Sequence, residues 1–90
     1  MDLIEKHEKK VQDLEVIANR YYNHNSKEYE NITAYFKLIR KGIIALKINH
    51  FKDEKEKNFQ INSLNALFKE LETKINEKMK EGIFYEKENC

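Results

Sequence analysis

Residues 43–61, IIALKINHFKDEKEKNFQI, decide whether the chain forms one long helix or two. Apolar side chains recur every three or four residues up to Leu46, as they do on one face of a helix. Continuing that spacing would place only polar residues on the same face, namely His50, Asp53, Lys57 and Gln60. The apolar spacing resumes at Ile61 in a shifted phase. Because an unbroken helix would turn a polar gap of about ten residues toward its partner, we expect a break between about residues 49 and 53.

Three apolar runs of this kind predict three amphipathic helices. The first run is Ile4, Val11, Leu14, Ala18 and Tyr21, with His7 among them. The second is Tyr29, Ile32, Phe36, Ile39, Ile43 and Leu46, and the third is Ile61, Leu64, Phe68, Leu71 and Ile75. We expect helices at about 2–22, 26–49 and 54–81, since the chain has no proline and only two glycines to interrupt them.

Residues at the expected helix ends agree with these bounds. Asp2 and Asn25 each stand three residues before a glutamate, which is the spacing of a capping box. Asp53 is the expected cap of the third helix, and Gly82 is its expected stop, since glycine readily takes the left-handed conformation that ends a helix.

The fold class follows from the three helices and their short connections. We expect an all-α fold, an antiparallel three-helix bundle (up-down-up) over residues 1–83, with a flexible C-terminal tail at 84–90. Helices of this length are marginal alone in water and need a shared apolar core. A helix continuous through residues 53–57 would instead indicate an elongated hairpin or a dimer.

Composition narrows the classes of partner and compartment. Seventeen basic and sixteen acidic residues leave a net charge of +1, whereas nucleic-acid binders usually carry a clustered basic excess. No apolar stretch approaches the roughly 20 residues that span a bilayer, so no membrane insertion is expected. The single Cys90 offers no internal disulfide, and with no secretory signal it favours a cytoplasmic, reducing location.

No pattern typical of a catalytic site stands out. The carboxylates lie among lysines on polar faces, and no histidine or cysteine stands three or four residues from His7 to share a metal with it. We interpret His7 as a bundle-end histidine with one ring nitrogen in water. The chain is therefore expected to be no enzyme and to hold no metal or cofactor.

The second helix carries more apolar residues than one face requires. Tyr35, Leu38 and Ala45 widen its apolar face on one side, which a helix packed between two others needs, so we interpret them as core. Ile44 and Ile48 fall on the opposite side. Either Phe51 or Phe59 covers them, or they form an exposed apolar patch that would mark a partner site. Basic residues surround them, namely Lys37, Arg40, Lys41 and Lys47.

Aromatic residues are expected to gather where the first helix meets the second. They are Tyr21, Tyr22, Tyr29, Phe84 and Tyr85. Closing that end of the bundle is their simplest role, and anchoring a partner peptide is the alternative.

From the turn between the first and second helices onward, five sequence features follow one another along the chain. They are the polar turn at 25–28, the aromatic Tyr35–Phe36, the pairs Leu38–Ile39 and Ala45–Leu46, the charged link at 53–57 and the apolar run Ile61, Leu64, Phe68, Leu71 and Ile75. In this order, residues 4–81 resemble the microtubule interacting and trafficking (MIT) domain, a three-helix module. Asn31 and Leu38 stand where that family has small residues.

The resemblance implies a non-enzymatic adaptor. Such domains hold a helical or extended motif of a partner, often the tail of an ESCRT-III-type protein, in a groove along the third helix. Here the groove between the second and third helices would have apolar edges and charged flanks. The apolar residues are Leu38, Ala45 and Leu67, and the charged ones are Glu70, Lys74 and Lys78. Leu67 is the clearest anchor, with ordinary core packing as its alternative role.

Two other interaction functions stay open. One is a small phage- or mobile-element-encoded protein that binds and inhibits a larger target, which the initial methionine favours if ninety residues are a whole protein. The other is a self-associating bundle, a homodimer in which Ile44, Ile48 and Leu67 meet their symmetry mates.

Overall fold

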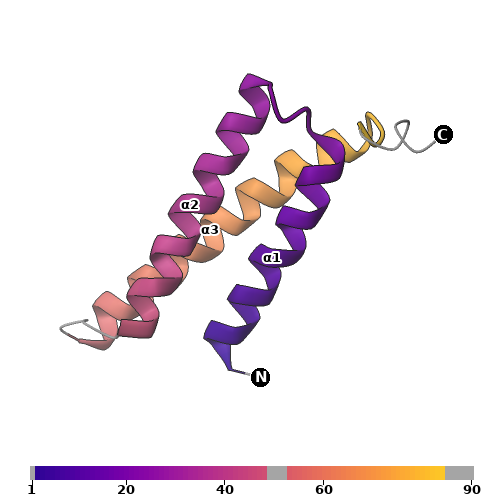
Figure 1. The fold of residues 1–90 in the computed structure, drawn as a ribbon. Helices are drawn as coiled ribbons and strands as arrows, with labels where there is room; N and C mark the ends of the chain where they lie inside the picture. The colour runs from indigo at the N-terminus through magenta and orange to yellow at the C-terminus, as the bar shows by residue number, and fades with distance from the viewer. Residues whose placement is uncertain (1, 49–52, 85–90) are drawn as a thin grey trace.

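Three helices pack against one another in the computed structural model, which describes residues 2–48 and 53–84. They are α1 (Leu3–Tyr21), α2 (Lys27–Ile48) and α3 (Glu54–Met79). Figure 1 shows α2 returning beside α1 in the opposite direction, with α3 running back behind both. The predicted all-α, antiparallel three-helix bundle is therefore confirmed.

The break between the second and third helices lies where the apolar spacing predicts it. α2 ends at Ile48, and Asp53 caps α3 by accepting a 2.9 Å hydrogen bond from the N–H of Glu56. Such a cap satisfies one of the backbone donors that the first helical turn leaves unpaired. The prediction of two helices in place of one is confirmed, and residues 49–52 lie outside the described part of the chain.

The N-terminal ends of α1 and α2 are also capped by side chains. The carboxylate of Asp2 accepts a 2.8 Å hydrogen bond from the N–H of Glu5, as expected. At α2 the cap is Ser26, whose hydroxyl oxygen accepts a 3.1 Å bond from the N–H of Tyr29. The expected capping residue Asn25 therefore stands one position too early, and α2 begins one residue later than predicted.

The C-terminal ends differ slightly from the expected bounds. α1 ends at Tyr21, and α3 ends at Met79 rather than near residue 81. Gly82 then takes a φ of 100°, the left-handed conformation expected of a glycine after a helix. Phe84, expected to open a flexible tail, has its N–H bonded to the carbonyl of Arg20 at 3.0 Å. Residues 85–90 of that tail lie outside the described residues.

The core is one apolar cluster to which all three helices contribute. Its fully buried members are Val11, Ala18, Tyr22, Ile32, Phe36, Ile39, Ile43, Leu46, Leu64, Phe68, Leu71 and Ile75. α2 supplies the largest share because it packs against a neighbour on each side, which a wide apolar face permits. Removal of these side chains from water is the main stabilising contribution to the fold.

α2 and α3 come into direct contact at Gly42, which is buried in the interior of α2. A Cβ atom built on Gly42 would lie 2.6 Å from Cδ2 of Leu64 and 2.9 Å from Nε2 of Gln60. Side-chain carbons do not approach one another so closely, so this spacing of the helices requires glycine. The residue costs helix propensity, about 1 kcal/mol relative to alanine, which the close packing of Leu64 offsets.

One aromatic residue closes the far end of the bundle. Tyr22 follows α1 directly, is buried, and donates a 3.2 Å hydrogen bond from its hydroxyl to the carbonyl of Lys74 in α3. Tyr29 is partly buried and donates a 2.8 Å bond to the side chain of Asn19. These bonds satisfy the polar ends of the rings where the apolar bodies pack.

His7 lies in the core, although the sequence predicts a bundle-end residue. It is only 7% exposed, and its ring stacks on Phe68 of α3 with centroids 5.2 Å apart. Nε2 is buried and has no hydrogen-bond partner among the described residues. α3 covers the ring more fully than predicted, and only Nδ1 is left for the expected contact of one ring nitrogen with water. Burial lowers the pKa of His7 from its ordinary 6.5, and the nearby charge of Lys10 lowers it further.

Replacing Gly42 with valine should destabilise the bundle. We expect a loss of about 2 kcal/mol in the free energy of unfolding, because the added carbons have no room against the fully buried Leu64. Urea denaturation measures this loss. The control is Ala34→Val on the exposed face of α2, which should cost a few tenths of a kcal/mol, about the difference in helix propensity. Equal losses in the two variants would show that the α2–α3 contact tolerates a side chain.

Acid should destabilise the protein through His7. In the unfolded chain the His7 side chain binds a proton below about pH 6.5. In the folded chain the pKa of His7 is lower, so the same side chain stays neutral until the pH falls further. The stability contributed by this residue is therefore complete above the unfolded pKa and falls as the pH drops toward the folded one. Urea denaturation at about pH 7.5 and about pH 5.5 measures it.

The matched variants for this experiment are His7→Leu and His24→Gln. The first should flatten the dependence of the unfolding free energy on pH, because it removes the buried titrating group. The second should retain it, since His24 is exposed. A His7→Leu protein as sensitive to acid as the parent would place the sensitivity elsewhere.

Candidate functional site

The Gly42 contact aligns the two helices that form the predicted groove. Leu38 lies one turn before Gly42 in α2, and Leu67 lies about one turn after Leu64 in α3. Because the helices are antiparallel, this places Leu38 and Leu67 at about the same level. Ala45, one turn after Gly42, comes level with Gln60. We call the surface formed by Leu38, Ala45 and Leu67 the α2–α3 groove.

The apolar residues of the α2–α3 groove differ in burial. Leu67 and Ala45 are partly buried, and Leu67 packs against the core cluster. Leu38 is 52% exposed, so its interpretation as core is wrong. Its exposure places Leu38 at the outer edge of the α2–α3 contact. The sequence-predicted groove therefore offers one half-exposed leucine beside a partly covered one.

A hollow of about 550 Å³ lies along α3 toward its C-terminal half. Its lining comes from Tyr35, Ala66, Lys69, Glu70, Thr73, Lys74 and Glu77. Two predicted residues, Glu70 and Lys74, therefore stand together at the surface. The Nζ atom of Lys74 lies 5.8 Å from the ring centroid of Tyr35, close enough for a cation–π contact. The hollow thus carries two lysines and two glutamates, with the predicted Glu70 and Lys74 among them.

Lys78, also predicted to supply charge to a partner, is engaged within the bundle. Its side chain is 15% exposed, and its Nζ lies 3.2 Å from Glu28 of α2 and 3.1 Å from Glu81. It also lies 5.4 Å from the ring centroid of Tyr22. Burial by itself lowers the pKa of Lys78, but hydrogen bonds to Glu81 and Glu28 outweigh it, so the net shift is upward. Lys78 therefore joins α2 to the end of α3, and a partner would have to compete with two carboxylates.

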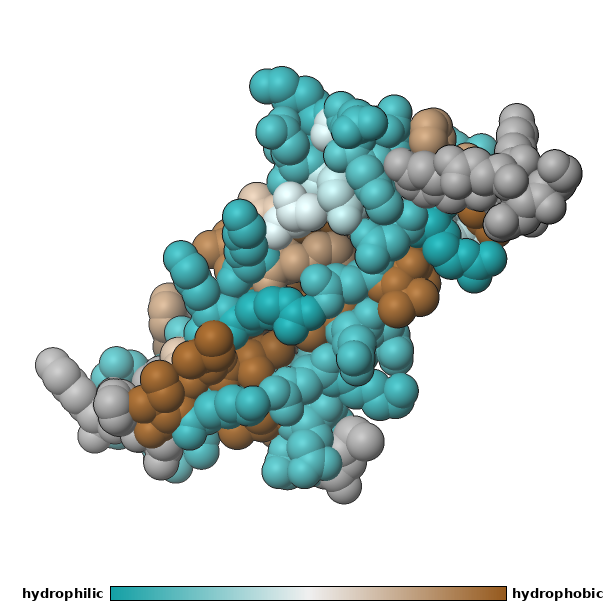
Figure 2. All heavy atoms as spheres, in the orientation of Figure 1, coloured by the Kyte–Doolittle hydropathy of each residue, from teal (hydrophilic) through white to brown (hydrophobic). Residues whose placement is uncertain are grey.

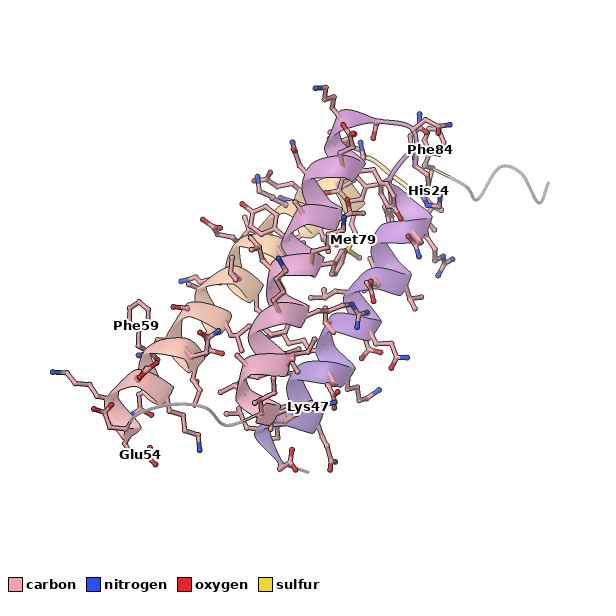
Figure 3. The ribbon with its side chains drawn as sticks, turned by 60° about the vertical axis from the view of Figure 1, so that its left-hand side comes forward. His24, Lys47, Glu54, Phe59, Met79 and Phe84 are labelled. Carbon is pink, nitrogen blue, oxygen red and sulfur yellow. The ribbon has the colours of Figure 1, made fainter. Side chains whose placement is uncertain are left out.

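A second exposed apolar surface lies on the outer side of α2. Ile44 is 53% exposed and Ile48 is 50% exposed. Figure 2 shows hydrophobic residues gathered at the lower left, over the C-terminal end of α2. Phe59, one of the two residues expected to cover them, is itself 72% exposed and points away from the bundle in Figure 3. The other, Phe51, lies outside the described residues.

Basic side chains continue this surface toward the middle of α2. Lys37 and Lys41 precede Ile44 and Ile48 at spacings of four, three and four residues. Residues so spaced form one row along a helix. All four are exposed. We call this row the α2 ridge.

Two further basic residues of α2 pair with α1. Arg40 forms an ion pair with Glu15, and the Nζ of Lys47 lies 2.5 Å from a carboxylate oxygen of Glu8. They are therefore part of the α1–α2 contact rather than of the ridge.

In the described part of the chain, no three His, Cys, Asp or Glu side chains come together as metal ligands would. None of the described helices has the length and apolar content to cross a bilayer. No model of a known protein family, no curated protein and no solved structure matches this chain. Its function is therefore argued from its two exposed surfaces.

Sequence reasoning missed two features of these surfaces. Gly42 occupies a position on the buried face of the predicted second helix, and a glycine there was a readable signal of close helix contact. The pairing of Lys78 with Glu28 joins residues fifty positions apart, and no local sequence pattern predicts it.

Two adjacent isoleucines test the assignment of the ridge to the surface. Ile43→Ala should cost about 3 kcal/mol of unfolding free energy, because Ile43 is only 3% exposed. Ile44→Ala should change it by no more than about 0.5 kcal/mol, since half of that side chain already meets water. Thermal and urea denaturation measure both. Similar losses would mean that Ile44 is covered in solution.

Proposed function

We propose that this protein is a non-enzymatic interaction module that binds a helical or extended peptide segment of another protein in the α2–α3 groove. The observation that carries the proposal is Leu38. A leucine that is half exposed beside a partly buried Leu67 is a place where a partner's apolar side chain gains contact area, and a separate hollow lies further along α3.

Binding in such a groove follows the helix-in-groove pattern. Apolar anchors of the peptide, one turn apart, would pack between Leu38 and Leu67. Glu70 and Lys74 carry opposite charges one turn apart on α3 and are both exposed, so they would select the direction and position of the peptide through complementary charges. Lys78 is left out of this role because Glu28 and Glu81 hold it.

The resemblance to MIT domains supports the finer form of the proposal. In that form the ligand is the tail of an ESCRT-III-type protein and the module acts in the cytoplasm, where a chain with one cysteine needs no disulfide. Leu38 adds bulk where the family has a small residue. We therefore expect Leu38 to contact the peptide from the α2 side, with Leu67 on the α3 side.

Binding of labelled peptides tests the proposal. Fluorescence anisotropy with a panel of synthetic ESCRT-III-type tail peptides should give saturable binding. Leu38→Asp should weaken it at least about tenfold, because a charge would replace the apolar anchor. Val16→Asp is the matched control, since Val16 is equally exposed on α1, away from the groove.

The outcomes separate the coarse and the fine proposals. Weaker peptide binding by Leu38→Asp, but not by Val16→Asp, supports the α2–α3 groove as the binding site. Binding of another amphipathic peptide, but of no ESCRT-III-type tail, would keep the interaction module and remove the MIT-like ligand. Wild-type protein that binds no peptide in the panel, or Leu38→Asp that binds as tightly as wild type, would remove the groove.

A further inference from the structure

The α2 ridge has the composition of a binding surface that the α2–α3 groove does not use. We propose that the row Lys37, Lys41, Ile44 and Ile48 is a docking site for an acidic amphipathic helix of another protein, packed lengthwise against α2. This inference does not rest on the function proposed for the groove, because the two surfaces involve different residues and different sides of α2.

The apolar half of the ridge is continuous. Ile44 and Ile48 are one turn apart on the same side of α2, so their exposed halves adjoin. Among the described residues, nothing buries either side chain by more than half. Val16, an exposed apolar residue of α1, has only polar residues one turn away on either side. The pair therefore provides two adjacent anchors that a helix could cover.

The charged half of the ridge identifies the partner's chemistry. From residue 31 to residue 48, α2 carries four basic and no acidic side chains. Two of them, Arg40 and Lys47, are neutralised by Glu15 and Glu8 of α1.

The other two basic residues keep an uncompensated charge. Within residues 2–48 and 53–84, Lys37 and Lys41 have no acidic partner. They also stand four residues apart, where like charges repel one another. Acidic side chains of a partner would relieve that repulsion.

The spacing of the ridge specifies a helix as the partner. Residues separated by four, three and four positions match the a and d positions of a coiled coil, whose side chains face a second helix along its length. From Lys37 to Ile48 the row extends over about three turns, roughly 16 Å. A partner helix would place apolar residues over Ile44 and Ile48, and glutamate or aspartate over the two lysines.

A second copy of this chain fits the ridge poorly. In a two-fold symmetric pair the same row meets itself. Parallel ridges would set Lys37 and Lys41 against the same lysines, and antiparallel ridges would set each lysine against an isoleucine. Neither arrangement pairs opposite charges, and the parallel one, which does cover isoleucine with isoleucine, also sets the lysines against one another. An anionic membrane would satisfy the lysines, but two isoleucines without an aromatic neighbour on the ridge give it little to insert.

Three designed peptides test the proposal on the intact protein. Each peptide is a labelled helix of about 21 residues with leucines at the a and d positions over one half of its length. At the positions that face Lys37 and Lys41, the first peptide has glutamate, the second glutamine and the third lysine. In fluorescence anisotropy the glutamate peptide should bind most tightly and the lysine peptide most weakly, with the glutamine peptide between them. The affinity of the glutamate peptide should be at least about tenfold that of the lysine peptide. The preference should shrink between about 50 and 500 mM NaCl.

Variants of the ridge then locate the binding. The pair Ile44→Ser and Ile48→Ser should weaken the glutamate peptide at least about tenfold, and Val16→Ser on α1 should not. The pair Lys37→Glu and Lys41→Glu should reverse the ranking, so that the lysine peptide binds best. Leu38→Ser, which shortens the groove leucine without adding a charge beside Lys37 and Lys41, should leave the binding unchanged. Circular dichroism checks that every variant keeps the helical content of the parent.

Contrary results would overturn the proposal in distinct ways. Equal affinity for the three peptides, or no binding of any, would remove the acidic helix as the occupant. A dimer in sedimentation equilibrium that Ile44→Ser and Ile48→Ser abolish would assign the ridge to self-association. Binding to phosphatidylserine vesicles that depends on the same residues, without peptide binding, would assign it to a membrane surface.

Discussion

The close packing of Leu64 against Gly42 is the contact on which the arrangement of the bundle depends. With no side chain at Gly42, α3 approaches α2 so nearly that a single added carbon would lie 2.6 Å from Leu64. This contact aligns the two helices, sets Leu38 level with Leu67 and turns the outer side of α2 to water. The α2–α3 groove lies beside this contact, whereas the α2 ridge lies on a part of α2 that neither neighbouring helix covers.

Electrostatic pairing divides the basic residues of α2 and α3 into two groups. Arg40, Lys47 and Lys78 contact carboxylates of other elements and help to align the helices. Such pairs contribute little stability when exposed, yet they occupy charges that a partner could otherwise use. Lys37 and Lys41 belong to the second group, whose charge is uncompensated in the described structure. Pairing therefore separates structural from available lysines, although their sequence context looks the same.

Much of the fold was predictable because it depends on local order. The apolar spacing of each run and the polar gap after Leu46 identify three helices and their boundaries within one or two residues. Caps were predicted with similar success, and Ser26 in place of Asn25 is a difference of one position between two residues that cap equally well. The exposed surfaces were harder to predict from apolar spacing. Leu38 and Ala45 share one side of α2, and spacing alone does not reveal which of them a neighbouring helix covers.

The sequence by itself determined the helices, their order and the apolar faces that must meet, since helix formation and amphipathicity depend on residues within a few turns of one another. Only the tertiary structure decided which apolar residues remain at the surface, that His7 lies under Phe68, and which lysines are paired. Those outcomes depend on the rotation of each helix about its axis and on contacts between residues far apart in the chain. Periodicity defines an apolar face only to within a broad arc, and steric fit at Gly42 selects the orientation within it.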